Sequence, residues 1–312
     1  MLKRLLLSIA TLLGVSILVF VLLRLIPGNV ADVIFESAGY LDPAAKKAIE
    51  KELGLDQPPL AQYGTWVAAL MRGDLGKSYR YERPAMEIIG PRFPVTFQLA
   101  VMSLLVSILI ALPAGILSAT RQDTWLDYAL RVFSLAGLSL PSFWLALLIL
   151  LLLVRAFSWS PEMTYVSPFQ DLGRNLLMFI WPALAVGYRA SALLMRVTRS
   201  SMLEVLREDY IRTAWSKGLA ERVIMVRHAM RNAILPVVTL LGIEIAFLIG
   251  GLVVTETVFN VPGLGLYLVD AILWRDYPIV QNIVMFIAVV VVFTNLAVDL
   301  LYGWLDPRVR FE

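Results

Sequence analysis

The sequence predicts an all-α membrane protein with six transmembrane helices, and three observations support this prediction. Hydrophobic residues make up 59% of the 312 residues and charged residues 16%, whereas soluble domains have roughly 45–50% and about 25%. The mean hydropathy is +0.76, and several apolar runs reach the ~20 residues that a helix needs to cross a bilayer. Basic residues gather beside these runs, as they do in short loops that stay in the cytoplasm.

Six apolar segments are long enough to cross the membrane. They are residues 5–26, 97–118, 132–154, 176–196, 234–258 and 280–304. The third contains Gly137 and Pro141, two helix breakers that neighbouring helices can compensate in a membrane. The fifth is rich in glycine, which favours close helix packing in lipid.

The distribution of basic residues predicts the orientation. The predicted inner segments hold fourteen Lys and Arg residues, while the two short outer loops hold three, namely Arg155, Arg174 and Arg275. Because Lys and Arg mark the cytoplasmic side, both termini are expected there. The first apolar run also suggests a cleaved signal peptide, but such a peptide has an apolar region of only about 7–15 residues. We therefore favour an uncleaved first span.

These spans divide the chain into four parts. Residues 1–26 form the first transmembrane helix, 27–95 a small outer domain, 96–304 a five-helix core with a cytoplasmic loop at 197–233, and 305–312 a cytoplasmic tail. The segment 27–95 has seven prolines, eight basic residues and nine acidic residues. This composition indicates an ordered, charge-balanced surface, with an amphipathic helix near residues 43–53.

The stretch 195–236 is the most informative part of the chain. It carries eight Lys or Arg residues against four acidic residues, whereas the whole chain has a net charge of only +3. Helical spacing places four of its residues on one face, namely Leu203, Leu206, Tyr210 and Ala214. Glu208 precedes Arg212 by four residues, which predicts a surface ion pair.

Gly218 is expected to end this helix, and a second helix would follow to about Asn232. The pattern therefore predicts a helix, a glycine turn and a second helix before the next span. One interpretation is an amphipathic helix that lies on anionic lipid. The other is a docking element for a cytoplasmic partner, and composition alone leaves both open.

Several kinds of chemistry are excluded by composition. The chain has no cysteine and a single histidine, His228, so we expect no disulfide, no thiolate chemistry and no cluster of cysteines or histidines that binds a metal. Gly76-Lys77-Ser78 is similar to the end of a phosphate-binding loop, but the required earlier glycine is replaced by Met71. The basic residues lie next to predicted spans, which argues for orientation rather than nucleic-acid binding. We therefore expect a protein without catalytic residues of its own.

Two adjacent motifs carry a resemblance to a known family. They read EDYIRTAWSKG at 208–218 and RHAMRNAILPV at 227–237. Five shorter motifs occur in the matching order: Pro27-Gly28, LGLD at 53–56, GDLG at 73–76, PGLG at 262–265 and Asp306-Pro307-Arg308. Together they resemble the permease subunits of ABC importers, in the dipeptide and oligopeptide branch. The resemblance covers nearly the whole chain.

The resemblance implies a type I ABC importer fold and a role as the permease for di- or oligopeptides. Such permeases work in the bacterial or archaeal cytoplasmic membrane with a second homologous permease, two ABC ATPase subunits and an extracytoplasmic substrate-binding protein. The chain itself would bind no cofactor, because ATP and magnesium belong to the ATPases. Membrane lipid is a further expected partner, and nucleic acid is not.

The resemblance also assigns a coupling helix at 208–218 that contacts or positions the ATPase. The residues carried over are Glu208, Asp209, Tyr210, Arg212, Thr213, Ala214, Lys217 and Gly218. The general importer motif has Glu-Ala-Ala where this chain has Arg212-Thr213-Ala214, so that only the last position matches. Alternatives are an importer of glutathione or a nickel chelate, or a secondary transporter. A secondary transporter typically has a symmetric pair of broken helices, which the sequence does not suggest.

Two charged residues lie inside predicted spans. Arg189 is in the fourth and Glu244 in the fifth, where a charge costs about 2.5–3.5 kcal/mol and usually faces a partner or a wet cavity. Both lie roughly 12 Å from the cytoplasmic edge at ~1.5 Å per residue. We therefore predict that they interact beside the translocation pathway. The alternative is that Arg189 reaches alone to the membrane surface and Glu244 caps a neighbouring helix.

Overall fold

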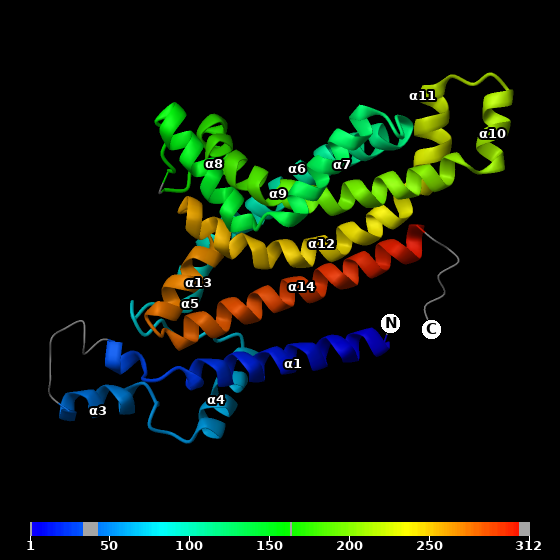
Figure 1. The fold of residues 1–312 in the computed structure, drawn as a ribbon. Helices are drawn as coiled ribbons and strands as arrows, with labels where there is room; N and C mark the ends of the chain where they lie inside the picture. The colour runs from blue at the N-terminus through cyan, green and yellow to red at the C-terminus, as the bar shows by residue number, and fades with distance from the viewer. Residues whose placement is uncertain (1, 34–42, 163, 306–312) are drawn as a thin grey trace. The chain divides into compact units, whose positions relative to one another are not determined.

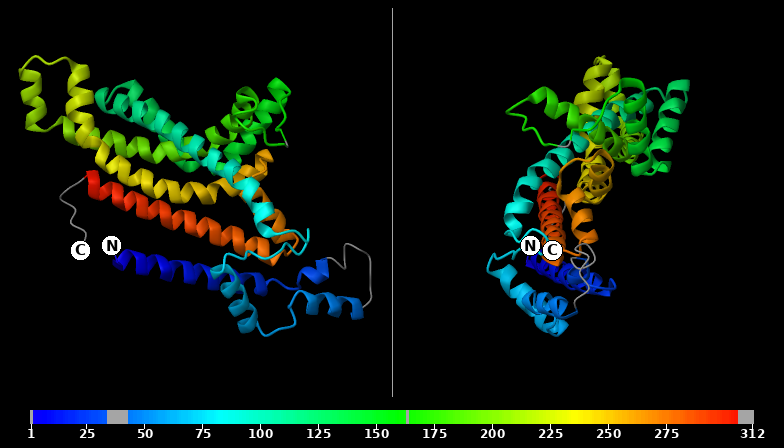
Figure 2. Two further views of the ribbon diagram at one scale, coloured as in Figure 1. Left: turned by 180° about the vertical axis from the view of Figure 1, so that it is seen from behind. Right: turned by 90° about the vertical axis from the view of Figure 1, so that its left-hand side faces the viewer.

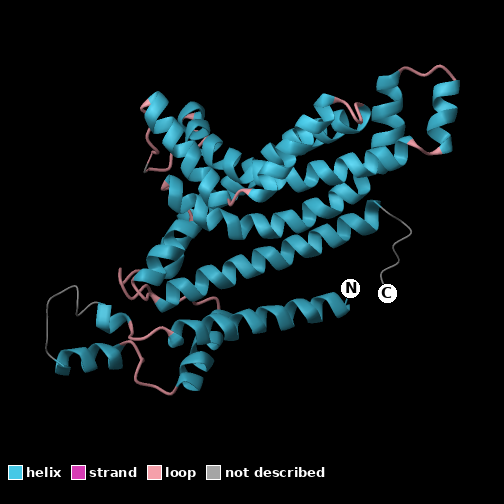
Figure 3. Ribbon diagram, in the orientation of Figure 1, coloured by secondary structure: helices cyan, strands magenta, loops and turns pink. Residues whose placement is uncertain are grey.

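The structure is a computed structural model that describes residues 2–33, 43–162 and 164–305. Throughout these ranges the chain is built from helices and no strand is formed (Figure 3). The β-type backbone pairing consists of one isolated bridge between Lys77 and Pro84. The predicted tail 305–312 and the motif Asp306-Pro307-Arg308 lie outside the described residues except for Leu305. The all-α prediction is confirmed.

The chain divides into two compact units. The first comprises residues 1–95 and 262–292, and the second comprises 96–261 and 293–312. The described residues of the segment 27–95 thus belong to one unit with the first helix and with a segment near the C-terminal end. Their place outside the membrane stays a prediction.

The first unit is a set of helices around one apolar core (Figure 1). Its elements are α1 (Leu2–Leu25), α3 (Pro43–Glu52), α4 (Pro59–Met71), α5 (Ala85–Ile89), the 3-10 helix η1 (Gly90–Arg92), α13 (Leu264–Leu273) and the first part of α14 (Tyr277–Leu305). The core joins Leu23 of α1, Ile88 of α5, Tyr267 of α13 and Ile283 of α14. The amphipathic helix predicted near 43–53 is confirmed as α3, whereas the connection between the fifth and sixth predicted spans contains a helix, α13.

The second unit is organised around its longest helix. Its elements are α6 (Phe93–Thr120, from Thr96 on), α7 (Trp125–Ser139), α8 (Ser142–Phe157), α9 (Leu172–Leu206), α10 (Asp209–Ser216), α11 (Glu221–Val223), the π-helix η2 (Ile224–Ala229) and α12 (Met230–Phe259). Figure 2 shows α9 and α12 side by side, and α9 also packs against α7 and α8. With 35 residues, α9 is about 52 Å long, so it extends beyond the ~30 Å apolar core of a bilayer.

A glycine allows α6 and α9 to approach closely. A Cβ atom added to Gly187 of α9 would lie 2.7 Å from the carbonyl oxygen of Ser103 and 2.7 Å from Cγ1 of Val106. Small residues at such contacts let helix backbones meet in lipid, where packing rather than water exclusion drives association. Gly187 therefore contributes to the tight packing of the second unit.

Five helices in the described part of the chain are long and apolar enough to cross a membrane. They lie within α1, α5–α6, α9, α11–α12 and α14, which confirms five of the predicted spans. Two further pairs of helices pass the same test only when taken together, namely α7 with α8 and the end of α12 with α13. Counting both pairs as broken spans gives up to seven, and counting only α7 with α8 gives the six that the sequence predicts.

The predicted continuous span 132–154 is wrong in one respect. It consists of α7 and α8, which meet at an angle of 106°. Leu140 adopts an extended backbone and Pro141 precedes the first residue of α8. Proline lacks an amide hydrogen and disfavours a helical conformation in the residue before it. Here neighbouring helices do not compensate for Pro141, and the helix breaks.

Candidate functional site: the loop between two long helices

The loop that joins α9 to α12 is a helical hairpin. It contains α10, a turn around Gly218, and α11, which continues through η2 into α12. Figures 1 and 2 show α10 beside the α11–η2 segment, beyond the ends of α9 and α12. The helix–turn–helix prediction is confirmed. The second helix does not stop near Asn232, however, because α12 begins at Met230 and continues into the membrane-spanning part.

One face of α10 is buried in an apolar cluster. Ile211 is 0% exposed and Ala214 is also buried, and both pack with Met202 of α9 and Ile224 of η2. The same cluster includes Ala119 at the end of α6. The hairpin is therefore packed against the ends of two long helices and does not hang free as a connector.

The opposite face of α10 is open. Tyr210 is 40% exposed and Trp215 is 47% exposed. Seven of the eight predicted coupling residues are exposed, namely Glu208, Asp209, Tyr210, Arg212, Thr213, Lys217 and Gly218, while Ala214 is buried. The Tyr210 hydroxyl accepts a hydrogen bond of 2.8 Å from Nδ2 of Asn232, which ties the open face to α12.

Two details predicted for this loop are wrong. The four residues predicted on one face do not share a helix, because α9 ends at Leu206 and α10 begins at Asp209. Arg212 pairs with Asp209 at 3.3 Å rather than with Glu208. Glu208 has an extended backbone before the first residue of α10, so the predicted spacing of four does not apply to it.

Gly218 ends α10 as predicted. Its backbone amide donates to the carbonyl oxygen of Trp215 at 2.9 Å, and its φ is +71°. This left-handed conformation favours glycine, since it brings a Cβ atom too close to the backbone carbonyl oxygen. No heavy atom outside the local backbone lies within 4 Å of an added Cβ. A larger residue here would thus act through the backbone of the turn rather than through a steric clash.

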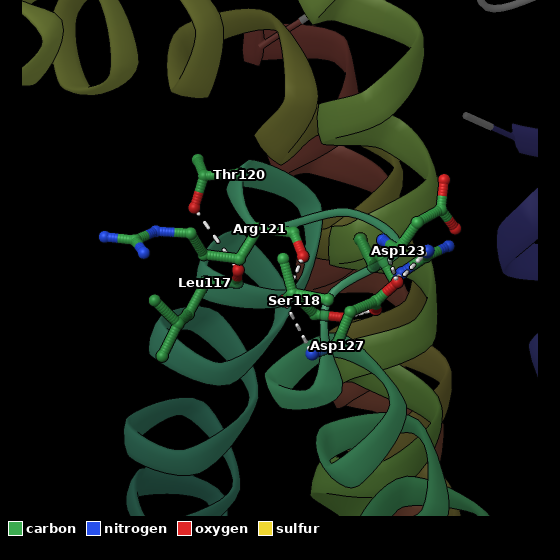
Figure 4. Close-up of polar contacts among 8 residues, drawn as sticks. Leu117, Ser118, Thr120, Arg121, Asp123 and Asp127 are labelled. Atoms are coloured by element: carbon green, nitrogen blue, oxygen red, sulfur yellow. Dashed lines mark hydrogen bonds and ion pairs between the residues drawn. The ribbon is translucent and has the colours of Figure 1, made fainter.

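A buried ion pair joins α7 to α9, and Figure 4 shows Ser118 and Asp123 beside its carboxylate group, that of Asp127. Asp127 of α7 is 0% exposed, and Arg199 of α9 donates to both of its carboxylate oxygens, from Nε at 2.9 Å and from Nη2 at 2.8 Å. Ser118 of α6 donates to the same carboxylate, as does the backbone amide of Asp123. This two-point geometry is the strong form of an arginine–carboxylate pair. We call Ser118, Asp127 and Arg199 the polar clamp.

The sequence analysis missed the polar clamp. Its local signal is the pattern Thr124-x-x-Asp127. The threonine hydroxyl accepts a 3.4 Å hydrogen bond from the backbone amide of Asp127 and so caps the start of α7. That pattern predicts a helix start but not a buried charge. Arg199 is 72 residues away and looks like one more basic residue of a cytoplasmic loop.

The two charges predicted inside the membrane do not form an ion pair in this structure. Arg189 of α9 is exposed and Glu244 of α12 is 9% exposed. No salt bridge within 4.0 Å joins them, although an electrostatic interaction with Arg189 acts on Glu244. The direct contact is therefore absent here, and the role of the two residues in a pathway stays a prediction.

A second polar cluster lies in the first unit. Asp276, between α13 and α14, accepts hydrogen bonds from the Ser78 hydroxyl and from the backbone amide of Tyr79 at 3.1 Å. Burial raises the pKa of Asp276, and the hydrogen bond from Ser78 acts in the opposite direction. Burial also raises the pKa of Tyr79 to about 12. This cluster joins the loop after α4 to the segment before α14 within the first unit.

Comparison with known proteins identifies the class. The model of the family described as "Binding-protein-dependent transport system inner membrane component" matches residues 111–311. A second model, for the N-terminal part of such membrane components, matches residues 1–100. The chain belongs to this family, so it is a multi-pass membrane permease component of a transport system that uses a binding protein.

Several named relatives match over almost their whole length. The chain is 38% identical to the dipeptide transport system permease protein DppB of Alkalihalophilus pseudofirmus, over 99% of this chain and 98% of the relative. It is 37% identical to DppB of Escherichia coli K12, over 100% and 98%. It is 41% identical to a putative peptide transport system permease protein of Brucella abortus, also over 100% and 98%.

Solved structures with a similar fold belong to amino-acid ABC transporters. One is an inward-facing form of the MetNI methionine ABC transporter, with a TM-score of 0.57 and 14% identity over 71% of this chain and 97% of that chain. Another is an amino acid ABC transporter crystallised with histidines, with a TM-score of 0.51 and 15% identity over 72% and 95%. These similarities show the type I ABC importer fold.

The polar clamp predicts a specific pattern of stability changes. Arg199→Met leaves the Asp127 carboxylate buried without its cation, and removing one partner of a buried pair costs roughly 3–5 kcal/mol. We therefore expect a clear fall in the thermal unfolding midpoint in detergent. Adding Asp127→Asn to Arg199→Met removes the unpaired charge, so the double variant should recover part of that loss.

The matched control is Arg207→Met, since Arg207 follows α9 directly and its side chain is exposed. This control should unfold at nearly the wild-type temperature. A midpoint for Arg199→Met equal to that of the control, or a double variant as unstable as the sum of the single changes, would contradict the structural role of the clamp.

Proposed function

We propose that the chain is the permease subunit of an ATP-driven importer for di- or oligopeptides. It forms half of the translocation pathway with a second homologous permease. Two ABC ATPase subunits dock on its α9–α12 loop, and an extracytoplasmic binding protein delivers the peptide. The chain carries out no ATP hydrolysis of its own, because ATP and magnesium bind to the ATPases.

One observation carries this proposal. The hairpin at α10 presents a row of exposed residues, while Ile211 and Ala214 on its other face are buried against the ends of α6 and α9. A docking helix needs both features. The open face provides contacts for a partner, and the buried face transmits the partner's movement to the membrane helices. Such rigid-body transfer between packed elements is a common means of switching.

The proposal also includes the orientation in the membrane and the outer partner. The loop and both termini lie in the cytoplasm, in agreement with the excess of basic residues there. The described residues of 27–95 share a compact unit with residues 262–265, and we propose that these two segments face the binding protein outside. The names of the full-length relatives, at 37–41% identity, support peptide as the substrate. A related importer of glutathione or a nickel chelate is the alternative.

We also propose that Arg189 and Glu244 lie beside the translocation pathway. Glu244 is largely buried on a membrane helix, and its electrostatic partner is Arg189 on the adjacent helix. Ionisable groups at such positions usually serve a pathway or a gate. Closure of the gate would bring the two side chains into direct contact. Alternatively, the charged terminus of a peptide would neutralise them.

Gly218 provides the test of coupling. Gly218→Val places a β-branched residue in a left-handed conformation, which costs roughly 1–2 kcal/mol even for simple side chains and distorts the turn that ends α10. We expect uptake of a labelled dipeptide to fall about tenfold in right-side-out vesicles, in line with that strain. ATP hydrolysis by the co-purified ATPases should continue. The variant therefore uncouples the two activities.

Gly218→Asn is the matched control, because asparagine tolerates the left-handed conformation, and its uptake should stay near wild type. The proposal fails if Gly218→Val transports normally. It also fails if no ATPase subunit co-purifies with the wild-type chain, and that result would favour a self-contained secondary transporter.

Charge reversal tests the pathway residues. Arg189→Glu and Glu244→Arg each place two like charges on adjacent helices, so each single reversal should impair peptide uptake. The double reversal restores opposite charges and should recover uptake. Arg121→Glu, a change at the exposed residue that directly follows α6, is the control for a general loss of positive charge. If the double variant is no better than the single variants, the two residues do not act on each other.

A further inference from the structure

A groove of about 450 Å³ runs between α7 and α9 in the second unit. Its lining includes Tyr128, Arg131 and Leu135 from α7 and Met195, Arg196 and Arg199 from α9. It lies on the side of the polar clamp at which Arg199 is partly exposed. The groove thus combines three cations with an apolar surface in one place.

The cations differ in how far they are neutralised. Arg199 is paired with Asp127, and Asp123 also acts on it electrostatically. Arg131 and Arg196 are exposed, and within the described ranges neither lies within 4.0 Å of a carboxylate in an ion pair. Arg131 contacts Tyr128 instead, with its guanidinium carbon 5.6 Å from the ring centre. The groove therefore retains about two unbalanced positive charges.

The apolar part of the groove is unusually open. Val132 is 67% exposed and Leu135 is 61% exposed on the outer side of α7, and both line the groove. At the start of the same helix, Trp125 is 79% exposed and Tyr128 is 53% exposed. Exposed tryptophan and tyrosine next to an apolar surface are typical of the level of lipid headgroups.

The positions of Arg131 and Arg196 along their helices agree with the level of the lipid headgroups. Arg131 immediately precedes the predicted apolar segment 132–154, and Arg196 ends the predicted segment 176–196. Both arginines therefore lie at a boundary between apolar and polar parts of the chain. Basic pockets between membrane helices at such a boundary bind anionic lipid headgroups.

We propose that the α7–α9 groove binds one membrane phospholipid with an anionic headgroup. Arg131 and Arg196 hold the phosphate of the headgroup, Tyr128 lies at its edge, and an acyl chain covers Val132 and Leu135. A helix of a second permease is a less suitable occupant, since it would leave two arginines facing an apolar surface without counter-charges. The bound lipid lies directly beside the polar clamp and completes the packing between α7 and α9.

Native mass spectrometry of the purified importer complex tests this proposal. The complex is titrated with phosphatidylglycerol or phosphatidylcholine in detergent, and the occupancy of bound lipid is measured. We expect wild type to retain phosphatidylglycerol in preference to phosphatidylcholine. Arg131→Gln combined with Arg196→Gln should weaken phosphatidylglycerol binding on the order of tenfold, because each basic residue near a lipid headgroup contributes a measurable part of the attraction.

Two further variants keep the test specific. Arg121→Gln with Arg207→Gln removes the same charge from exposed positions outside the groove, and it should bind phosphatidylglycerol as wild type does. Arg131→Lys with Arg196→Lys keeps both charges and should retain most of the binding, even if the glutamine variant folds poorly. Equal retention of the two lipids by wild type, or an equal loss in the Arg121 and Arg207 control, overturns the proposal.

A cross-linking experiment distinguishes lipid from protein in the groove. The chain has no cysteine, so Leu135→Cys introduces a single reactive site. It should remain accessible to a lipid-soluble maleimide in the intact complex. Complete cross-linking of this cysteine to the second permease would instead show that the groove is a subunit interface, and would overturn the proposal.

Discussion

The buried pair of Asp127 and Arg199 is the interaction on which the packing beneath the α9–α12 loop depends. A carboxylate that is 0% exposed is costly unless its charge is paired and its remaining oxygen sites are satisfied. Here two arginine nitrogens, a serine hydroxyl and a backbone amide surround it. The four donors come from α6, from the turn before α7 and from α9. The requirement to satisfy one carboxylate therefore fixes the ends of three helices relative to one another.

The apolar cluster lies directly next to the polar clamp. Ala119 follows Ser118 in α6, and Met202 lies one turn beyond Arg199 in α9; both belong to the cluster that buries Ile211 and Ala214 of α10. The polar clamp orders the helix ends, and the apolar cluster seats the hairpin on them. A displacement of α10 is thus transmitted through close-packed side chains, which resist deformation. This arrangement explains how a short loop helix can act on long membrane helices.

The two faces of α10 also explain its departure from the general importer motif. The one matching position, Ala214, is buried in the cluster, where a larger side chain would not fit without displacing its neighbours. Arg212 and Thr213 occupy exposed positions. Packing within this chain does not determine their identities, so these positions can differ from the general motif without disturbing the apolar cluster.

The sequence was sufficient for features that depend on local chemistry. Continuous apolar runs predict the helices α1, α6, α9, α12 and α14, because length and composition alone determine whether a helix can cross a membrane. Gly218 predicts the end of α10, because few other residues adopt its left-handed backbone. Features that depend on the balance between local and tertiary effects were not predictable. Pro141 breaks a span that neighbours were expected to support, and α9 stops at Leu206 although the apolar pattern continues.

The polar clamp was out of reach for a different reason. Asp127 and Arg199 are far apart in the sequence, and each has an ordinary local environment as a capped helix start and a basic loop residue. Their pairing follows only from the packing of α7 on α9, where Ser134 donates a 2.7 Å hydrogen bond to the carbonyl oxygen of Ala192. In the same way, equal predicted depth allowed an Arg189–Glu244 contact, but depth alone does not determine which way side chains turn around two helices.

The central claim is that α10 moves as one body with the helix ends that the clamp holds together. Spin labels at Ser216→Cys on α10 and Trp125→Cys at the start of α7 meet no background from this chain, which has no cysteine, and the other subunits are used in cysteine-free form. Pulsed electron spin resonance then measures the distance between them in the complex, without nucleotide and with ATP trapped. The account predicts the same distance distribution in both states. A shift or a marked broadening of that distribution on trapping ATP would show that α10 moves independently, and would contradict the account.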